Sequence, residues 1–429
     1  MSLELDSLRA RLESEQSMMI WRETLRVLGP DVARRLRTLP NRFNTFDDMV
    51  HAAVWTTKEI VDLLAKWDMP LNQMDPGHAL GHIARDHISA LLIALYSPQL
   101  SLNERFVAII AGSLHDIGCA LFSRYADGQG VVRHADAGGL LLERALFHVG
   151  ASADKSAMEP FSFQEEVSIV SAVVAHTHYL KPMQMKDRSG QEYTIAPFED
   201  VVDDVPVWSM WLTRWADRLD ANGPTFVARH FLTLGEGHKD FASDVGFYET
   251  EFASHLEPLL RTPDEIKRAG TRTMLEHLDM FRASQTNETP YGRFDNAGMC
   301  VLRDARTAQL EKIIAAVRDA RPHHSEDTIL EAWIAFLSDT IEPQPLIGRP
   351  CAQKLVTAFR HLPQDTRQAW LAGFEQTMML YRDEWYPDLL RHLDALKIAA
   401  PSLNLYTLVF FGKPIVKFLA PSSSWTNLL

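Results

Sequence analysis

The chain has 429 residues, which is long enough for two or three domains with a large core. Hydrophobic residues make up 46% of it and charged residues 23%, as in ordinary soluble globular proteins. The formal net charge of -13 argues against a nucleic-acid-binding protein, because such proteins usually carry a basic patch or stripe.

The cysteines and the start of the chain bear on the compartment. Cys119, Cys300 and Cys351 lie far apart and form no CxxC pair, so neither a disulfide framework nor a cysteine zinc site is predicted. Residues 1–6 lack the basic start and apolar run of a signal peptide. No stretch of about 18 uncharged apolar residues predicts a membrane-spanning helix. We therefore expect a cytoplasmic protein.

Residues 1–70 are predicted to form a helical N-terminal extension. Its second helix is expected to stop at Gly29-Pro30, because both residues disfavour a helix interior. A third helix is expected to begin at Thr45, where Asp48 completes a capping box three residues on. We expect this extension to pack on the segment that follows. Its alternative role is a dimerisation element, which leaves a homodimer open.

Residues 71–240 are predicted to form a helical domain. Ser101 with Glu104 and Ser162 with Glu165 are capping boxes that open two of its helices. Residues 181–207 are rich in Pro, Gly and Asp and predict a long loop, with a short hairpin around residues 189–190. Helices are expected at about 78–96, 101–118, 134–149, 162–176 and from 208 onward.

Residues 241–429 are predicted to form a mostly helical C-terminal region of unknown role. Thr262-Pro263 is a strong helix start, and Ser325 is expected to cap another helix. Further helices are expected at about 350–361, 365–382 and 384–398. Residues 406–411 are β-prone and predict a short strand or a docking segment. The whole pattern predicts an all-α protein.

Histidine and aspartate recur where the central helices begin or end. His78 and His82 lie four residues apart and Arg85 follows three later, so all three share one helix face. His115 and Asp116 close an apolar helix before Gly118, where a buried charge must be paired or bound to a metal. Four later residues extend the series: His134 opens a helix, His176 and His178 close the next, and Asp217 follows.

The order of these residues resembles the HD-domain metal-dependent phosphohydrolases. Residues 77–85 resemble the first-ligand helix of that superfamily, with His82 in the ligand position and Arg85 in a common following position. Residues 114–118 match the signature pair, and residues 216–221 resemble the segment that bears the last aspartate. The resemblance covers about residues 75–225. It implies an HD-domain helical bundle with helical extensions on both sides.

Two further segments resemble the two-metal members of the superfamily. Residues 133–139 and 174–178 match the helix ends that supply extra ligands there, and His176 is preferred to His178 because it keeps phase with its helix's apolar face. The resemblance implies bridging by Asp116 and a six-residue ligand set of His82, His115, Asp116, His134, His176 and Asp217. A one-metal site that leaves out His134 and His176 is the alternative.

Imidazole and carboxylate ligands together suit Mn, Fe, Ni, Co or Zn better than Mg or Ca. The resemblance implies hydrolysis of a small phosphorylated substrate, a phosphomonoester or phosphodiester and possibly nucleotide-like, by a metal-activated water. Besides Asp116, the candidate catalytic residues are Arg85 and Lys181 as cations and His78 as a proton donor.

One departure and two alternatives qualify this hypothesis. Cys119 stands where many family members have a lysine that helps to hold an anionic substrate. Phosphate binding must then come from elsewhere, or the substrate differs. A di-iron oxygenase of the HD fold has a similar ligand order and is one alternative. A non-catalytic, nucleotide-responsive sensor or scaffold is the other.

Overall fold

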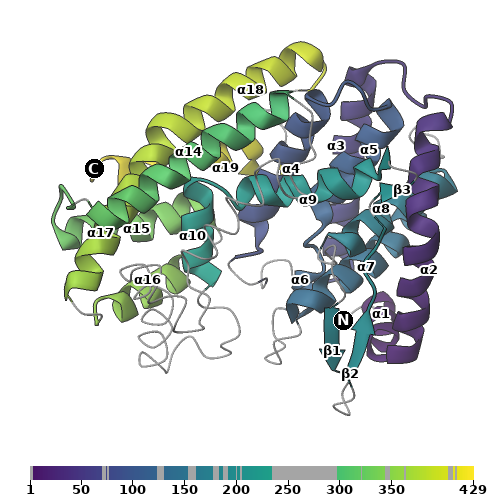
Figure 1. Cartoon of the computed structure of the whole chain (residues 1–429), viewed down its shortest axis with the longest axis horizontal. Coiled ribbons are helices and arrows are strands. Elements are labelled where there is room, and N and C mark those ends of the chain that lie inside the picture. Colours follow the sequence, from purple (N-terminus) through teal and green to yellow (C-terminus); the bar gives the residue numbers. More distant parts are fainter. Residues whose placement is uncertain are drawn as a thin grey trace. The chain divides into compact units, whose positions relative to one another are not determined.

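Helices dominate the structure, a computed structural model of the chain (Figure 1). It describes residues 3–69, 74, 77–122, 130–152, 161–176, 183–186, 192–199, 201–202, 205–233, 297–319, 321–343, 348–361, 364–403, 409–410 and 413–429. Strands within these ranges form only short two-stranded pairs. The prediction of an all-α protein is confirmed.

The chain forms two compact units, each built from separate stretches. Unit 1 holds Met1–Met74, Ile83–Asp217 and Ala395–Lys413, and unit 2 holds Asp75–His82, Arg218–Asp394 and Pro414–Leu429. Two continuous helices, α4 (Leu80–Leu95) and α9 (Trp208–Asp220), each contribute residues to both units. The predicted boundaries near residues 70 and 240 stay a prediction.

Unit 1 begins with α1 (Leu3–Glu13), α2 (Glu15–Arg35), the short 3-10 helix η1 (Leu36–Thr38) and α3 (Phe46–Lys66). The predicted stop at Gly29-Pro30 is wrong, because α2 runs through both residues. A side chain at position 29 would collide with Ser171, so glycine allows α2 to lie directly on the helix that carries Ser171. This packing offsets the helix hydrogen bond that Pro30 removes.

The centre of unit 1 contains α5 (Leu102–Leu114), α6 (Cys119–Phe122), α7 (Gly130–Ser152) and α8 (Phe163–Ala175). The predicted capping boxes at Thr45, Ser101 and Ser162 are all confirmed. Helix α8 packs on α2, α5 and α7, and these helices share one apolar core. Helix α5 ends four residues before the predicted Gly118, with His115 as its C-terminal cap.

The segment between α8 and α9 contains two short antiparallel pairs. Strands β1 (Met183–Lys186) and β2 (Glu192–Ile195) pair with Met183 opposite Ile195, which confirms the predicted hairpin. Strands β3 (Val201–Val202) and β4 (Val205–Pro206) form the second pair. The third pair in the described chain joins β5 (Val409–Phe410) and β6 (Lys413–Pro414).

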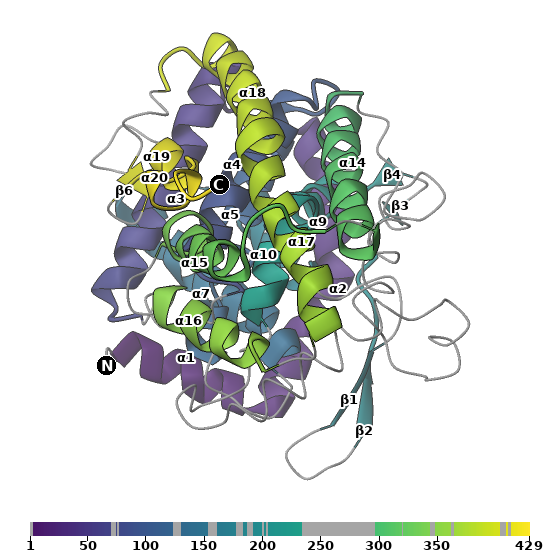
Figure 2. The same cartoon turned by 90° about the vertical axis from the view of Figure 1, so that its left-hand side faces the viewer.

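In unit 2, the helices that pack on one another are α10 (Pro224–Thr233), α15 (Glu326–Phe336), α16 (Gly348–Phe359) and α17 (Gln364–Leu380) (Figures 1 and 2). Buried aromatic side chains contribute to the core of this unit. Trp333 and Phe374 stack at 4.3 Å between ring centroids, and Phe231 meets Phe374 edge-on at 5.2 Å. The helix expected at Thr262 lies outside the described residues. The helices after α9 are α10 (Pro224–Thr233), α14 (Ala297–Asp319), α15 (Glu326–Phe336), the π-helix η6 (Leu337–Ile341), α16 (Gly348–Phe359), α17 (Gln364–Leu380), the π-helix η7 (Tyr381–Trp385), α18 (Tyr386–Ala399), α19 (Ile415–Leu419) and α20 (Ser423–Thr426).

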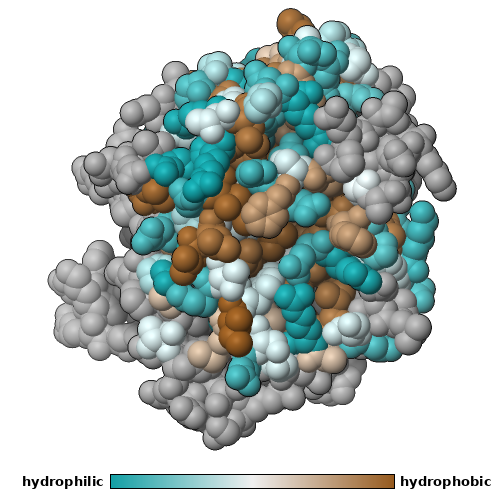
Figure 3. Space-filling view, turned by 90° about the vertical axis from the view of Figure 1, so that its right-hand side faces the viewer, coloured by the Kyte–Doolittle hydropathy of each residue, from teal (hydrophilic) through white to brown (hydrophobic). Residues whose placement is uncertain are grey.

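The surface of unit 1 carries apolar side chains on the face shown in Figure 3. Helix α2 contributes Met19, Ile20, Val27 and Leu28, which are about half exposed or more. The predicted homodimer stays a prediction, because this exposure alone identifies no partner. Among the described helices, none has the length and apolar character needed to cross a membrane.

Candidate metal centre

The end of α5 places three potential ligands in one buried turn. His115 caps the helix, Ile117 N donates to Leu114 O at 3.1 Å, and Cys119 N donates to Asp116 O at 2.9 Å. A turn closed by an i to i+3 hydrogen bond brings the side chains at its two ends to one side. His115, Asp116 and Cys119 are each at most 5% exposed.

Glycines allow α7 to approach this turn. A Cβ at Gly118 would collide with the carbonyl oxygen of His134 and with the amide nitrogen of Gly138. A Cβ at Gly139 would collide with Val174 on α8. At Gly118 the obstructing atoms belong to the backbone, so only glycine permits this contact without moving the main chain. The two glycines therefore bring His134 on α7, and His176 at the end of α8, up to Asp116.

Asp116 lies among three imidazole rings. Its Oδ1 is 3.2 Å from Nε2 of His134, 3.3 Å from Nε2 of His176 and 3.5 Å from Nε2 of His115. The Nε2 atoms of His134 and His176 are 3.1 Å apart. A carboxylate oxygen so close to three ring nitrogens could share a metal ion with them.

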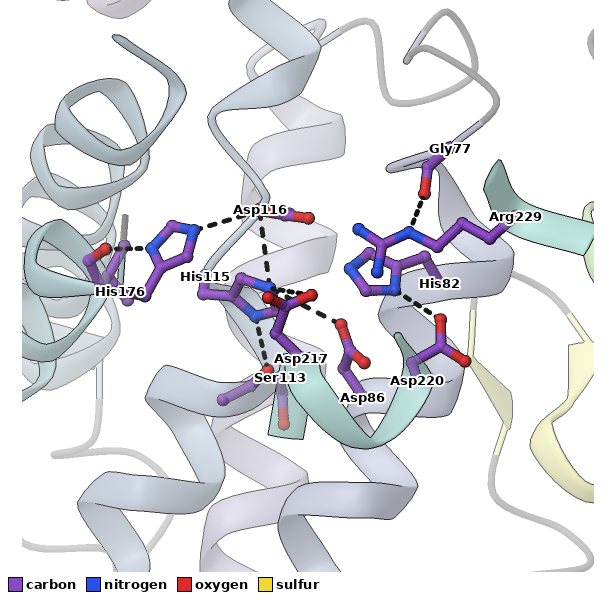
Figure 4. A network of polar contacts seen from close by, with 12 residues as sticks. Gly77, His82, Asp86, Ser113, His115, Asp116, His176, Asp217, Asp220 and Arg229 are labelled. Carbon is purple, nitrogen blue, oxygen red and sulfur yellow. Dashed lines mark hydrogen bonds and ion pairs between the residues drawn. The ribbon is translucent and has the colours of Figure 1, made fainter. Parts of the chain in front are cut away.

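His115 in turn faces three carboxylates, as Figure 4 shows. Its Nε2 lies 3.7 Å from Oδ2 of Asp86 and 4.0 Å from Oδ1 of Asp217, in addition to the 3.5 Å to Asp116. Asp86 comes from α4 and Asp217 from α9. Ligand oxygens of Asp86 and Asp217 lie within 4.8 Å of each other. Because like charges so close oppose each other's ionisation, a cation between them would stabilise both carboxylates.

Hydrogen-bond partners at Nδ1 orient three of the imidazole rings. His115 Nδ1 donates to Gly112 O at 2.9 Å, and His176 Nδ1 donates to Val173 O. In unit 2, His82 Nδ1 lies 2.7 Å from Oδ2 of Asp220. A hydrogen bond at Nδ1 fixes the tautomer that presents Nε2 as the ligand atom, as is usual for metal-binding histidines.

Burial also sets the charge state of the rings. It lowers the pKa of His115 and of His176 below the ordinary histidine value, although nearby Asp116 acts in the opposite direction on both. Both imidazoles are therefore neutral near pH 7. Neutral imidazole is the form that binds a metal ion.

Three groups in the described part of the chain bring their ligand atoms within 4.8 Å of one another. The first comprises His82, Asp86, His115 and Asp217, the second His115, Asp116 and His176, and the third Asp116, Cys119 and His134. Shared residues, His115 and then Asp116, link the groups into one buried cluster. Its imidazole, carboxylate and thiol donors fit divalent transition metals better than Mg or Ca.

All six ligands expected from the sequence lie in this cluster, and their role as ligands stays a prediction. His78, on the turn before α4, is half-buried, and its ring meets that of His82 edge-on at 6.0 Å. Arg85 is 3% exposed on α4. Lys181 and His178 lie outside the described residues.

Sequence reasoning missed Asp86 and gave Cys119 no ligand role. Asp86 lies four residues after His82, on the same face of α4, and that spacing is the signal that could have found it. Cys119 lies three residues after Asp116 across a turn. The position of Cys119 becomes informative only once α7 is packed beside this turn.

A buried ion pair holds α7 against α2 next to the cluster. Arg22 Nε donates to Oδ1 of Asp136 at 3.1 Å, and Arg22 Nη2 donates to Oδ2 of the same carboxylate. Asp136 follows His134 by two residues. This pair therefore holds the first turns of α7 near Asp116.

Comparison of the chain with protein-family models, with curated proteins and with solved structures finds no match. The structure itself shows an all-α protein with a buried cluster of histidine and aspartate side chains that could hold a metal ion.

Proposed function

We propose that this chain is a metal-dependent phosphohydrolase of the HD type that uses two transition-metal ions. The observation that carries the proposal is the position of Asp116, whose Oδ1 lies within 3.5 Å of three imidazole nitrogens. Asp116 also belongs to two of the three potential ligand groups. A carboxylate shared in this way is what a two-metal site needs as a bridge.

The residues of the cluster divide into two sets around Asp116. One ion would be held by His82, Asp86, His115 and Asp217. The other would be held by His134 and His176, whose Nε2 atoms lie 3.1 Å apart. Asp220 orients His82 through the contact at Nδ1. When bound, the two metal ions would activate water as Lewis acids and would neutralise charge on the phosphoryl oxygens.

The protein would exclude bulk water from the site, orient the metal ligands and supply the side chains that bind the substrate. Arg85 follows His82 by three residues on α4, so both side chains lie on one face of the helix. A guanidinium there is suited to bind phosphoryl oxygens in a bidentate manner. His78 is the candidate proton donor to the leaving group, and Lys181 stays a predicted second cation.

The test is hydrolysis by the full chain loaded with Mn²⁺, Co²⁺ or Ni²⁺. We expect phosphate release from a chromogenic phosphomonoester, a chromogenic phosphodiester or a panel of nucleotides. Asp116→Asn should abolish this release, whereas His148→Asn, on α7 outside the cluster, should keep it. Absence of hydrolysis from every substrate, with two ions demonstrably bound per chain, would overturn the proposal.

The same preparation separates the alternative functions. An iron-loaded chain whose absorption spectrum changes on exposure to O₂, and which hydrolyses no phosphate ester, would indicate the di-iron oxygenase. A chain that binds nucleotide without turnover, and whose binding survives Asp116→Asn, would indicate the sensor or scaffold.

A further inference from the structure

Cys119 is the member of the cluster that the proposed phosphohydrolase chemistry leaves unused. Its side chain is buried, and its Sγ belongs to a group with the ligand atoms of Asp116 and His134, all within 4.8 Å of one another. The chain has three cysteines, and in the described residues Cys119 is the one that such a group includes.

The backbone holds Cys119 in this position. Its amide donates to the carbonyl oxygen of Asp116 at 2.9 Å, which folds residues 116–119 into a tight turn. The main chain of α7 touches Gly118 so closely that a Cβ there would collide with His134 O. The turn is therefore clamped between α5 and α7, and Cys119 faces the same space as Asp116.

We propose that Cys119 is a thiolate ligand to the ion that Asp116 and His134 hold. On binding, the thiol loses its proton to solvent and its sulfur donates an electron pair to the divalent ion. With bond lengths of about 2.3 Å to sulfur and about 2.0–2.1 Å to nitrogen, two ligands of one ion lie at most about 4.4 Å apart. The ligand atoms of Asp116, Cys119 and His134 all lie within 4.8 Å of one another, which is close to this upper limit.

A sulfur ligand makes the two halves of the site chemically different. The half formed by His82, Asp86, His115 and Asp217 offers only nitrogen and oxygen, and the half at His134 also offers sulfur. Thiolate favours softer ions such as Zn²⁺ or Fe²⁺, whereas carboxylate accepts Mn²⁺. The inference rests on the proposed function only in requiring that the cluster binds metal.

The test is the absorption spectrum of the full chain loaded with Co²⁺, because a cobalt–thiolate bond gives a near-ultraviolet charge-transfer band that nitrogen and oxygen ligands do not. We expect this band in the unaltered chain at two ions per chain. Cys119→Ser should remove it and weaken the second ion at least about tenfold, since losing even an outer partner of a ligand costs about 10–100-fold. Cys351→Ser, a buried cysteine on α16, should leave the band unchanged.

Alkylation of the unaltered chain gives a reading that does not depend on how a variant folds. Zn²⁺ should slow the reaction of Cys119 with iodoacetamide in mildly denaturing buffer, because a thiolate bound to the ion is not free to attack the reagent, and leave that of Cys300 unchanged. Two bound cobalt ions without the band, or equal alkylation of Cys119 with and without Zn²⁺, would overturn the inference. Either result leaves phosphate hydrolysis standing, and a band without any hydrolysis would retain the thiolate and reject the phosphohydrolase.

Discussion

The two units bury opposite kinds of side chain at their centres. Around Asp116, unit 1 buries imidazoles and carboxylates whose contacts are 3.2–4.0 Å long. Around Phe374, unit 2 buries aromatic rings whose centroids lie 4.3–5.8 Å apart. Both residues are at most 2% exposed. Equal burial therefore serves two different purposes in one chain.

Stability and metal binding are expected to depend on different parts of the chain. Burying aromatic surface stabilises the folded state, and ring contacts add to that gain. Burying carboxylates lowers stability unless a cation or a hydrogen bond compensates. We therefore expect substitutions around Asp116 to change metal binding far more than stability, and substitutions around Phe374 to do the reverse.

The largest expected effect follows Asp116→Asn. It removes the carboxylate shared by two ligand groups, so affinity for both ions should fall by more than about 100-fold. The metal-free variant should melt at the same temperature as the metal-free parent or higher, because one buried negative charge is gone. Metal titration and calorimetry measure both quantities. A large loss of stability in the metal-free state would contradict the distinction between the two units.

Phe374→Ala should give the opposite result. Removing this ring from the stack with Trp333 should lower the free energy of unfolding by about 3–5 kcal/mol. Cobalt content of the folded fraction should stay at the parent value. Chemical denaturation followed by circular dichroism measures the loss, and Phe374→Leu should retain part of the stability. Loss of bound cobalt from the folded protein would show that the two centres are coupled.

Arg22→Ala should be nearly as destabilising, for an electrostatic reason. It leaves the Asp136 carboxylate buried without its guanidinium, at a cost of about 3–5 kcal/mol. The double variant Arg22→Met with Asp136→Leu should recover most of this loss, because it removes both charges. Glu23→Ala, which breaks the exposed pair with Arg26, is the matched control and should cost less than about 1 kcal/mol.

The smallest effect is expected at a helix start away from the cluster. Thr45→Ala removes the side-chain acceptor of the Asp48 amide at the start of α3 and should cost about 1 kcal/mol. Thr45→Ser should cost only a small part of that, because it keeps the acceptor oxygen. Neither change should alter metal content. A loss well above about 2 kcal/mol would show that α3 depends on its cap more than on its packing.

The features that could be predicted from the sequence depend on residues that lie close together along the chain. The capping boxes at Thr45, Ser101 and Ser162 are local, because each joins side chains and amides three residues apart. The stop at Gly29-Pro30 was wrong because contacts with α8 decide whether α2 continues. Helix propensity carries no information about such contacts.

The residues of the candidate site also differ in whether the sequence alone could identify them. His115-Asp116 and the histidines at helix ends could be recognised from order and spacing. Asp86 follows His82 by four residues and could have been found in the same way, although it was missed. Cys119 could not, since its relevance depends on α7 lying beside the turn after α5. The close approach at Gly118 is a tertiary contact that no local pattern predicts.

Metal content per chain is the decisive measurement for the proposed two-ion site. The full chain, purified without chelators, should contain two transition-metal ions per chain by elemental analysis. Asp116→Asn, purified in the same way, should contain none. A parent chain that contains no metal, and that takes up none on dialysis against Mn²⁺, Co²⁺ or Zn²⁺, would contradict the account.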